Sequence, residues 1–371
     1  MKIKKMVVCA LGVLAAAFTL NMGGLVAYAE ENSGCYVVTE QTPDKIMDYA
    51  KAEFSECLYA HLSSNGISAG GKKFTLGSPI NLRETGGTNH IYDFPVMCND
   101  EIFAILTIYD AGGDYFTQFE QNIMADKLNE LQSQSAKSNP IVLVSDGDGL
   151  FAVLDGNAVS LVPDVDDNSF DETLALNTLA DDGIVVDVKD VLAVADEAGI
   201  MAMEASNPSP LGVTSVPQTD DGTFSGTQKE WCGAAVTAAI INYKKGISLT
   251  AKDVTIEALG SAKNEGITND QVVAVAKKHN LSPKTGDPLS YSSVQTQINA
   301  YRPIFMQMQR STDEGKKYHA LTLIGYSSTK YTIINPWYSY SLTIDKKDSG
   351  SSVTYVTGTR TYKWYKSVYN W

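Results

Sequence analysis

Apolar residues in the first half of the chain recur at helical spacing in two segments and at strand spacing in five. Residues 43–63 predict a helix that ends at the Ser and Gly residues of positions 63–66, and residues 122–134 predict a second helix. The predicted strands are separated by Gly and Asp turn residues and cover residues 74–76, 91–96, 102–109, 141–144 and 150–154. Helices combined with a mainly antiparallel sheet predict an α+β domain.

The second half changes midway from helical spacing to strand spacing. The predicted helices cover residues 232–243, 251–259 after a Thr250 cap, 269–279 and 292–301. The predicted strands cover residues 304–309, 320–326, 331–334, 341–344 and 353–359. A helical lobe followed by an antiparallel sheet or barrel lobe leaves a cleft between the two, which is a natural place for a site.

The N-terminal segment has the composition of an export signal. Lys2, Lys4 and Lys5 precede an apolar run over residues 6–20, and small residues lead to the A-x-A sequence that ends at Ala29. This pattern predicts a signal peptide over residues 1–29, whereas a membrane anchor needs a longer apolar run. Because no later segment approaches ~20 apolar residues, we expect a secreted protein without a membrane span.

The net charge of −14 is divided unevenly between the two halves. Residues 211–371 carry 18 Lys/Arg and 12 Asp/Glu, whereas residues 30–210 carry 8 Lys/Arg and 31 Asp/Glu. Complementary charge favours docking of one half on the other. The junction is rich in small residues and proline, which favours proteolytic cleavage there. The predicted organisation is a signal peptide (1–29), an acidic α+β domain (30–200), a processing linker (201–212) and a second domain (213–371).

Cys232 stands alone in the second half. Cys9 leaves with the signal peptide, and Cys35, Cys57 and Cys98 could form one disulfide whose pairing the sequence does not specify. An exposed thiol outside the cell is open to oxidation, so an unpaired Cys232 suggests that the thiol is used. The alternative is a buried and inert cysteine.

Two acidic clusters in the first half resemble metal sites only superficially. The residues at 146–149 fit a hairpin turn better than a metal site. The residues at 164–168 begin like a calcium loop, but Ser169 replaces the turn glycine and Ala175 replaces the closing carboxylate. We therefore expect no metal cofactor.

Cys232 begins a helix of small and apolar residues that should be buried. The N–H groups and dipole at a helix N-terminus favour a thiolate, so we expect a lowered pKa for the thiol. Of the two histidines in the second half, His279 fits a helix end, whereas His319 starts an apolar strand. A hairpin can bring Asn335 beside His319 so that its amide orients the ring, and Trp337 can shield that hydrogen bond.

These elements resemble the papain-like clan, most closely the staphopain-type secreted peptidases of bacteria. The resemblance rests on Trp231-Cys232, His319-Ala320, Asn335-Pro-Trp337 and the C-terminal Tyr-Lys-Trp-Tyr-Lys-Ser-Val-Tyr, and it covers residues 213–371. It implies that Cys232 is the nucleophile, His319 the general acid and base, and Asn335 the orienting residue. It also implies a two-lobed papain-like fold and an inhibitory propeptide, built from a half-barrel sheet with a helix, in a secreted Gram-positive zymogen.

One feature of the clan is missing. The clan places an oxyanion-stabilising glutamine six residues before the cysteine, and Gly226 occupies that position here. Gln218 fits a strand end followed by a longer loop, and Gln228 fits a tighter turn. Both remain candidates.

The predicted function is hydrolysis of peptide bonds through a Cys-His-Asn triad and a thioester acyl-enzyme, without any cofactor. The expected partners are a protein or peptide substrate, the chain's own propeptide and a proteinaceous inhibitor, with no nucleic acid. Two alternatives stay open. One is a related Cys/His amidase or a hydrolase of leader or cell-wall peptides, and the other is an inactive secreted binding protein.

Overall fold

The computed structural model describes residues 34–84, 87–145, 149–165, 167, 170, 176–177, 183–195, 209–312 and 315–371. The predicted signal peptide, most of the predicted linker and three residues of the predicted turn at 146–149 lie outside these residues. The signal peptide and the linker therefore stay predictions. None of the described helices is long and apolar enough to cross a membrane.

The first half builds a helix-covered sheet and a second, smaller sheet. Its described helices are α2 (Asp44–Ser64) and α3 (Ile123–Gln132). Its described strands are β1 (Tyr36–Thr39), β2 (Phe74–Leu76), β3 (Ile80–Arg83), β4 (His90–Cys98), β5 (Glu101–Ala111), β6 (Asp114–Glu120), β7 (Ile141–Ser145), β8 (Leu150–Leu154), β9 (Asn157–Ser160), β10 (Leu176–Asn177), β11 (Ile184–Asp187) and β12 (Ala193–Val194). Strands β2, β4, β5 and β6 are consecutive antiparallel neighbours, and the smaller sheet has the order β11-β1-β7-β8-β9 with β1 and β7 parallel.

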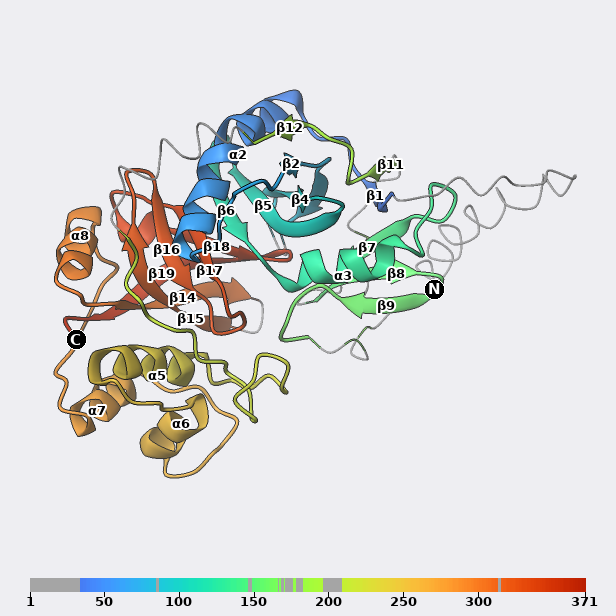
Figure 1. Cartoon of the computed structure of the whole chain (residues 1–371). Helices are drawn as coiled ribbons and strands as arrows, with labels where there is room; N and C mark the ends of the chain where they lie inside the picture. Colours follow the sequence, from blue (N-terminus) through green and yellow to red (C-terminus); the bar gives the residue numbers. More distant parts are fainter. Residues whose placement is uncertain are drawn as a thin grey trace, which may run out of the picture. The chain divides into compact units, whose positions relative to one another are not determined.

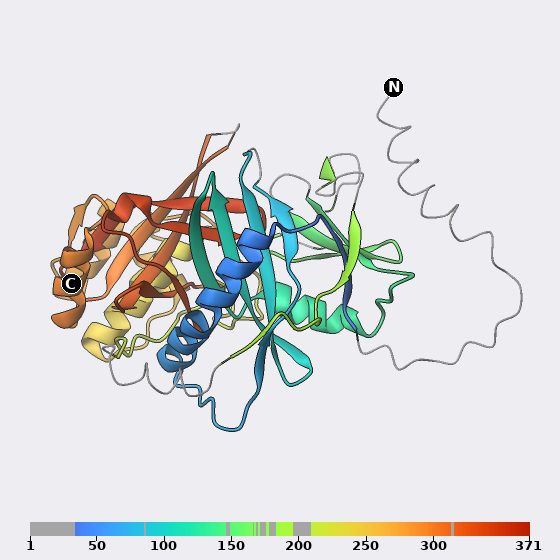
Figure 2. The same cartoon turned by 90° about the horizontal axis from the view of Figure 1, so that it is seen from above.

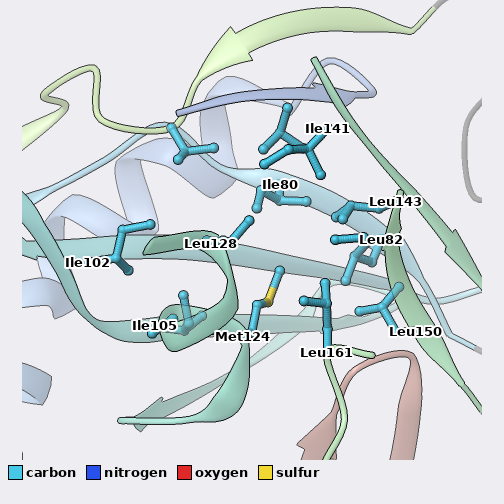
Figure 3. Packing of buried hydrophobic residues seen from close by; sticks show 14 of the residues in the cluster. Ile80, Leu82, Ile102, Ile105, Met124, Leu128, Ile141, Leu143, Leu150 and Leu161 are labelled. Carbon is cyan, nitrogen blue, oxygen red and sulfur yellow. The ribbon is translucent and has the colours of Figure 1, made fainter. Parts of the chain in front are cut away.

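Helix α3 fills the space between the two sheets of the first half. Asn122 starts the helix because its side chain accepts the N–H of Ala125. Met124 and Leu128, four residues apart, point from one face of α3 into a core formed with β3, β5, β7 and β8 (Figure 3). Each fully buried aliphatic side chain in such a core contributes about 1.5–3 kcal/mol.

The second half consists of helices followed by a sheet, as its sequence predicts. The described helices are α5 (Cys232–Lys245), α6 (Ala251–Leu259), α7 (Asn269–Lys278) and α8 (Tyr291–Asn299). The described strands are β13 (Lys284–Gly286), β14 (Ile304–Thr312), β15 (Gly315–Tyr326), β16 (Lys330–Ile334), β17 (Ser341–Asp345), β18 (Thr354–Thr357) and β19 (Arg360–Tyr369). Thr250 and Thr268 each form a capping box, which explains why α6 and α7 begin where they do.

One sheet continues from the first half into the second. Strand β6 pairs antiparallel with β17, so the larger sheet runs in the order β12-β2-β4-β5-β6-β17-β16-β15-β14-β19-β13. Helix α2 packs on β5 and β6 and also on β16 and β17 (Figures 1 and 2). We call the contact of α2 and β6 with β16 and β17 the seam. The buried side chain of Lys330 lies in the seam, and its Nζ lies 2.9 Å from Glu53, 2.7 Å from Asp345 and 2.6 Å from the Thr117 hydroxyl.

The predicted α+β fold is confirmed, with large antiparallel sheets. The predicted helices and strands are present with ends shifted by a few residues. The main omission is strand β19, which is ten residues long and was not predicted because its apolar and charged residues follow no clean alternation. The cysteines of the described residues are all free, so no disulfide forms among Cys35, Cys57 and Cys98.

Candidate active site

Cys232 is the first residue of helix α5, as predicted. The helix starts close to the loop at 266–267: a Cβ on Gly233 would lie 3.2 Å from the Ile267 side chain and 3.6 Å from its carbonyl oxygen. A glycine after the cysteine therefore allows the close approach. The helix is buried from Gly233 to Ile241 and ends at Gly246, whose φ of 65° suits glycine.

The sulfur of Cys232 lies against the start of the buried part of β15. Backbone N–H groups of Ala320, Gly233 and Cys232 itself point at the sulfur and lower the pKa of the thiol. Burial has the larger effect and raises that pKa to about 11. Ala320 directly follows His319, so the sulfur lies against the strand that carries the imidazole, and Cys232 and His319 line the same cavity.

His319 is held by Asn335 through the register of β15 and β16. Thr322 pairs with Ile334, the last residue of β16, so Asn335 emerges beside the strand that carries His319. The His319 Nε2 lies 3.0 Å from the Asn335 Oδ1. Nε2–H therefore donates to the amide oxygen, which leaves Nδ1 as the basic nitrogen. The predicted pairing of His319 with Asn335 is present.

Trp337 and Tyr355 enclose this pair. The Trp337 ring stacks on His319 with centroids 4.1 Å apart and planes at 20°. The Asn335 Nδ2 donates to the Tyr355 hydroxyl at 2.7 Å, and the Asn335 Oδ1 also accepts the backbone N–H of Trp337 at 3.2 Å. Asn335 is fully buried, so water cannot compete for its amide. Trp337 therefore has the shielding position expected from the sequence.

The first half contributes one residue, Glu120, that lies behind the His319–Asn335 pair. Nothing in the sequence pointed to this residue. Glu120, the last residue of β6, is buried beside the Asn335 amide. Burial raises the pKa of the Glu120 carboxyl to about 8, while the hydrogen bonds offered by Asn335 and Gln118 lower it. Glu120 is therefore a neutral acid at pH 7. No sequence pattern distinguishes it from other acidic residues.

The thiol and the imidazole are both uncharged in this structure. Burial lowers the pKa of His319 to about 4, and the Asn335 hydrogen bond opposes the shift. With the Cys232 pKa at about 11, the pair at pH 7 is a thiol and a neutral imidazole. The lowered thiol pKa predicted from the helix N-terminus is wrong for this state, because desolvation outweighs the helix N–H groups.

A cavity of about 1070 Å³ opens in front of Cys232 and His319. The helical side contributes Glu230, Gly233 and the loop at 266–269, and β14 contributes Phe305 and Gln307. The remaining wall is strongly basic and is lined by Arg310, Lys316, Lys317, Arg360 and Lys366. The first half also reaches the cavity, through Gly149, Asp164 and Val165. The arrangement offers a nucleophile and a base at the edge of a charged cleft.

The two candidate oxyanion glutamines lie near the site but do not line the cavity. Gln218 is buried, its N–H reaches the Pro336 carbonyl at 3.4 Å, and its Nε2 donates to the Lys229 carbonyl at 2.7 Å. Gln228 pairs with Thr219 in an isolated bridge. Gln218 thus links the Asn335 loop to the segment before Cys232. His279 caps α7 and lies 3.0 Å from Glu257, away from the cavity, as its helix-end position predicts.

Comparison with known proteins supports a peptidase. Residues 210–360 match the model of the Peptidase_C39 like family. No curated protein matches the chain. A solved structure of a C39-like peptidase from Bacillus anthracis is similar at 13% identity over 38% of this chain and 100% of that chain, with a TM-score of 0.27. The family match includes Cys232, His319 and Asn335, and it supports a cysteine peptidase hydrolase without pointing to the staphopain type.

Proposed function

We propose that the chain is a secreted cysteine endopeptidase of papain-like, staphopain-like type that is made as a zymogen. The observation that carries the proposal is the hydrogen bond of 3.0 Å between His319 and Asn335, together with the presence of His319 and Cys232 in the lining of one cavity. An amide that fixes one ring nitrogen of a histidine leaves the other nitrogen directed at a nucleophile. The family match over residues 210–360 supports the same class.

The reaction follows from these positions. His319 Nδ1 takes the thiol proton, and the Cys232 thiolate attacks the substrate carbonyl carbon. The oxyanion is held by the Cys232 N–H; neither Gln218 nor Gln228 lines the cavity, so either amide would have to turn toward the carbonyl to add a second donor. His319 then gives its proton to the leaving amine as the C–N bond breaks, and water attacks the thioester with His319 as base. Every step uses side chains of the chain, so the mechanism needs no cofactor.

Latency of the precursor is part of the proposal. A neutral thiol beside a neutral imidazole is the unreactive form, and the pKa values of Cys232 and His319 favour it in the intact chain. Three residues of the first half line the same cavity. Cleavage in the linker at 201–212, followed by loss of the acidic half, would admit substrate and water. The chain's first half thus acts as its own inhibitor, a role that a separate inhibitor protein could also fill.

The test compares Cys232→Ala with Cys98→Ala. Full-length protein is purified before and after cleavage within the linker, and hydrolysis of casein and labelling by a papain-class epoxide are measured. We expect Cys232→Ala to abolish both signals and Cys98→Ala, which removes another partly exposed thiol, to leave both unchanged. Casein hydrolysis by the Cys232→Ala protein would disprove the proposal.

A hydrolase of leader or cell-wall peptides remains the second candidate. The family match names C39-like peptidases rather than staphopains, which favours keeping this alternative. The same assay distinguishes the two candidates when purified peptidoglycan and a leader peptide are added as substrates. An enzyme of the second kind would cleave one of these and leave casein intact.

A further inference from the structure

An ion pair between the two halves lies at the edge of the cavity. Asp164, which follows strand β9 in the first half, binds Arg360 of β19 with both carboxylate oxygens: Oδ1 lies 2.6 Å from Nη2 and Oδ2 lies 2.9 Å from Nη1. Both residues line the cavity that contains Cys232 and His319. A two-point contact of this kind matches the planar guanidinium to a carboxylate and to few other groups.

The surroundings of the Arg360 guanidinium favour the binding of an anion. Its side chain is 3% exposed, and its Nε has no hydrogen-bond partner among the described residues. The adjacent turn at Gly358 and Thr359 fixes the start of β19, where Arg360 pairs with Thr357. Burying a guanidinium costs free energy unless an anion accompanies it. If the first half leaves, Asp164 leaves with it, and Arg360 then faces the cavity without its carboxylate.

The site for that carboxylate is close to the reacting groups. The charge of Asp164 raises the pKa of His319 and the charge of Arg360 lowers it, so both lie within electrostatic range of the imidazole. Lys316, Lys317 and Lys366 add positive charge to the same side of the cavity. Among its described lining residues, Glu230 and Asp164 are the acidic ones, and Asp164 comes from the half that is to be removed.

We propose that Arg360 binds a carboxylate of the substrate peptide in a subsite near His319 and so determines the specificity of cleavage. Asp164 occupies this subsite until the first half is removed. The inference rests on the proposed function, because it names the substrate class of the same site. The carboxylate has two possible sources, an Asp or Glu side chain or the free C-terminus of a peptide. Loss of two charge-assisted hydrogen bonds should reduce kcat/KM about tenfold to a hundredfold.

The test uses full-length protein cleaved within the linker at 201–212. The variants are Asp164→Asn, the double variant Asp164→Asn with Arg360→Gln, and Asp164→Asn with Arg360→Lys. In the double variant the ion pair becomes two neutral amides, so no buried charge is left alone if the first half stays bound. Asp48→Asn is the matched control, because Asp48 is an exposed first-half residue that pairs with Lys51 on the surface of α2.

The substrates are twin peptides that share one cleavage sequence taken from a casein digest. In one set both ends are capped, and Asp or Asn stands at each position within three residues of the cut. In the other set all residues are neutral, and the C-terminus is a free acid or an amide. The first set detects recognition of a side-chain carboxylate, and the second detects recognition of the terminal carboxylate.

We expect the wild type, Asp164→Asn and Asp48→Asn to prefer one carboxylate-bearing twin by about tenfold or more in kcat/KM. The double variant should lose this preference to within about twofold, and the Arg360→Lys protein should keep part of it. Equal preference in the wild type and the double variant, or no preference at any position, would overturn the inference. Failure of every protein to cleave any peptide would instead refute the proposed function.

Discussion

The seam between the two halves and the cleft beside Cys232 handle charge in opposite ways. In the seam, Lys330 is 2% exposed and has three oxygen partners, two of them from the first half. In the cleft, basic side chains from β14, β15 and β19 line an open cavity whose nearest first-half anion is Asp164. The seam is therefore suited to holding the halves together, and the cleft is suited to exchanging one anion for another. Four substitutions test the roles of the two regions.

The largest effect is expected in the cleft, from His319→Ala. Without the base that activates Cys232, kcat/KM for peptide hydrolysis by the cleaved protein should fall about 10²–10⁴-fold. The control is His279→Ala, which removes a histidine paired with Glu257 outside the cavity and should leave the rate within about twofold. Equal losses in the two variants would show that the effect is structural.

In the seam, Lys330→Met should destabilise the intact chain by about 1–3 kcal/mol, because Glu53 and Asp345 would remain partly buried without their cation. Urea unfolding in a Cys232→Ala background, which lacks the proposed nucleophile, measures this change. Lys45→Met removes an exposed lysine that lies 4.0 Å from Asp110 and should leave the stability close to that of the parent protein. A Lys330→Met protein as stable as the control would mean that the seam ion cluster contributes little.

Asn335→Ala should reduce kcat by about 10–100-fold and leave KM nearly unchanged, since the amide orients His319 without touching the substrate. Asn335→Gln, which keeps an amide, should restore part of the rate if the cavity around Trp337 and Tyr355 admits one more methylene. A change confined to KM would contradict an orienting role.

The smallest effect concerns Glu120 and depends on pH. Its pKa is about 8 in the folded chain and lies near 4.5 when exposed, so the folded state holds the proton between these values and stability falls as pH rises from about 4.5 to 8. Glu120→Gln should remove on the order of 2 kcal/mol of that decline. Asp93, whose pKa burial raises to about 7, adds a decline of its own in both proteins. If the free energy of unfolding falls by the same amount between pH 5 and pH 8 in the variant and in the wild type, the contribution assigned to Glu120 is wrong.

Sequence patterns predicted the parts of the molecule that depend on local rules. The start of α5 at Cys232, the Thr250 cap, and the pairing of His319 with Asn335 across a hairpin all follow from turn residues and side-chain periodicity. These features need only neighbours that are close along the chain.

Contacts between distant segments were not predictable from one sequence. Glu120 is 215 residues from Asn335, and Asp164 is 196 residues from Arg360, so neither pair leaves a local signature. The β6–β17 pairing is equally remote. The pKa of Cys232 shows the same limit, since the helix N-terminus is visible in the sequence but the burial that raises the pKa to about 11 is not.

On the proposed function, His319 should ionise the sulfur of Cys232 once the first half is removed. The rate of alkylation of Cys232 by iodoacetamide, followed by mass spectrometry from pH 5 to pH 10, tests this most directly. We expect slow labelling of the intact chain up to pH 9, labelling of the cleaved wild type at pH 6 far faster than that of glutathione, and loss of this fast reaction in cleaved His319→Ala. A cleaved wild type that reacts as slowly as the intact chain, with or without His319, would contradict it.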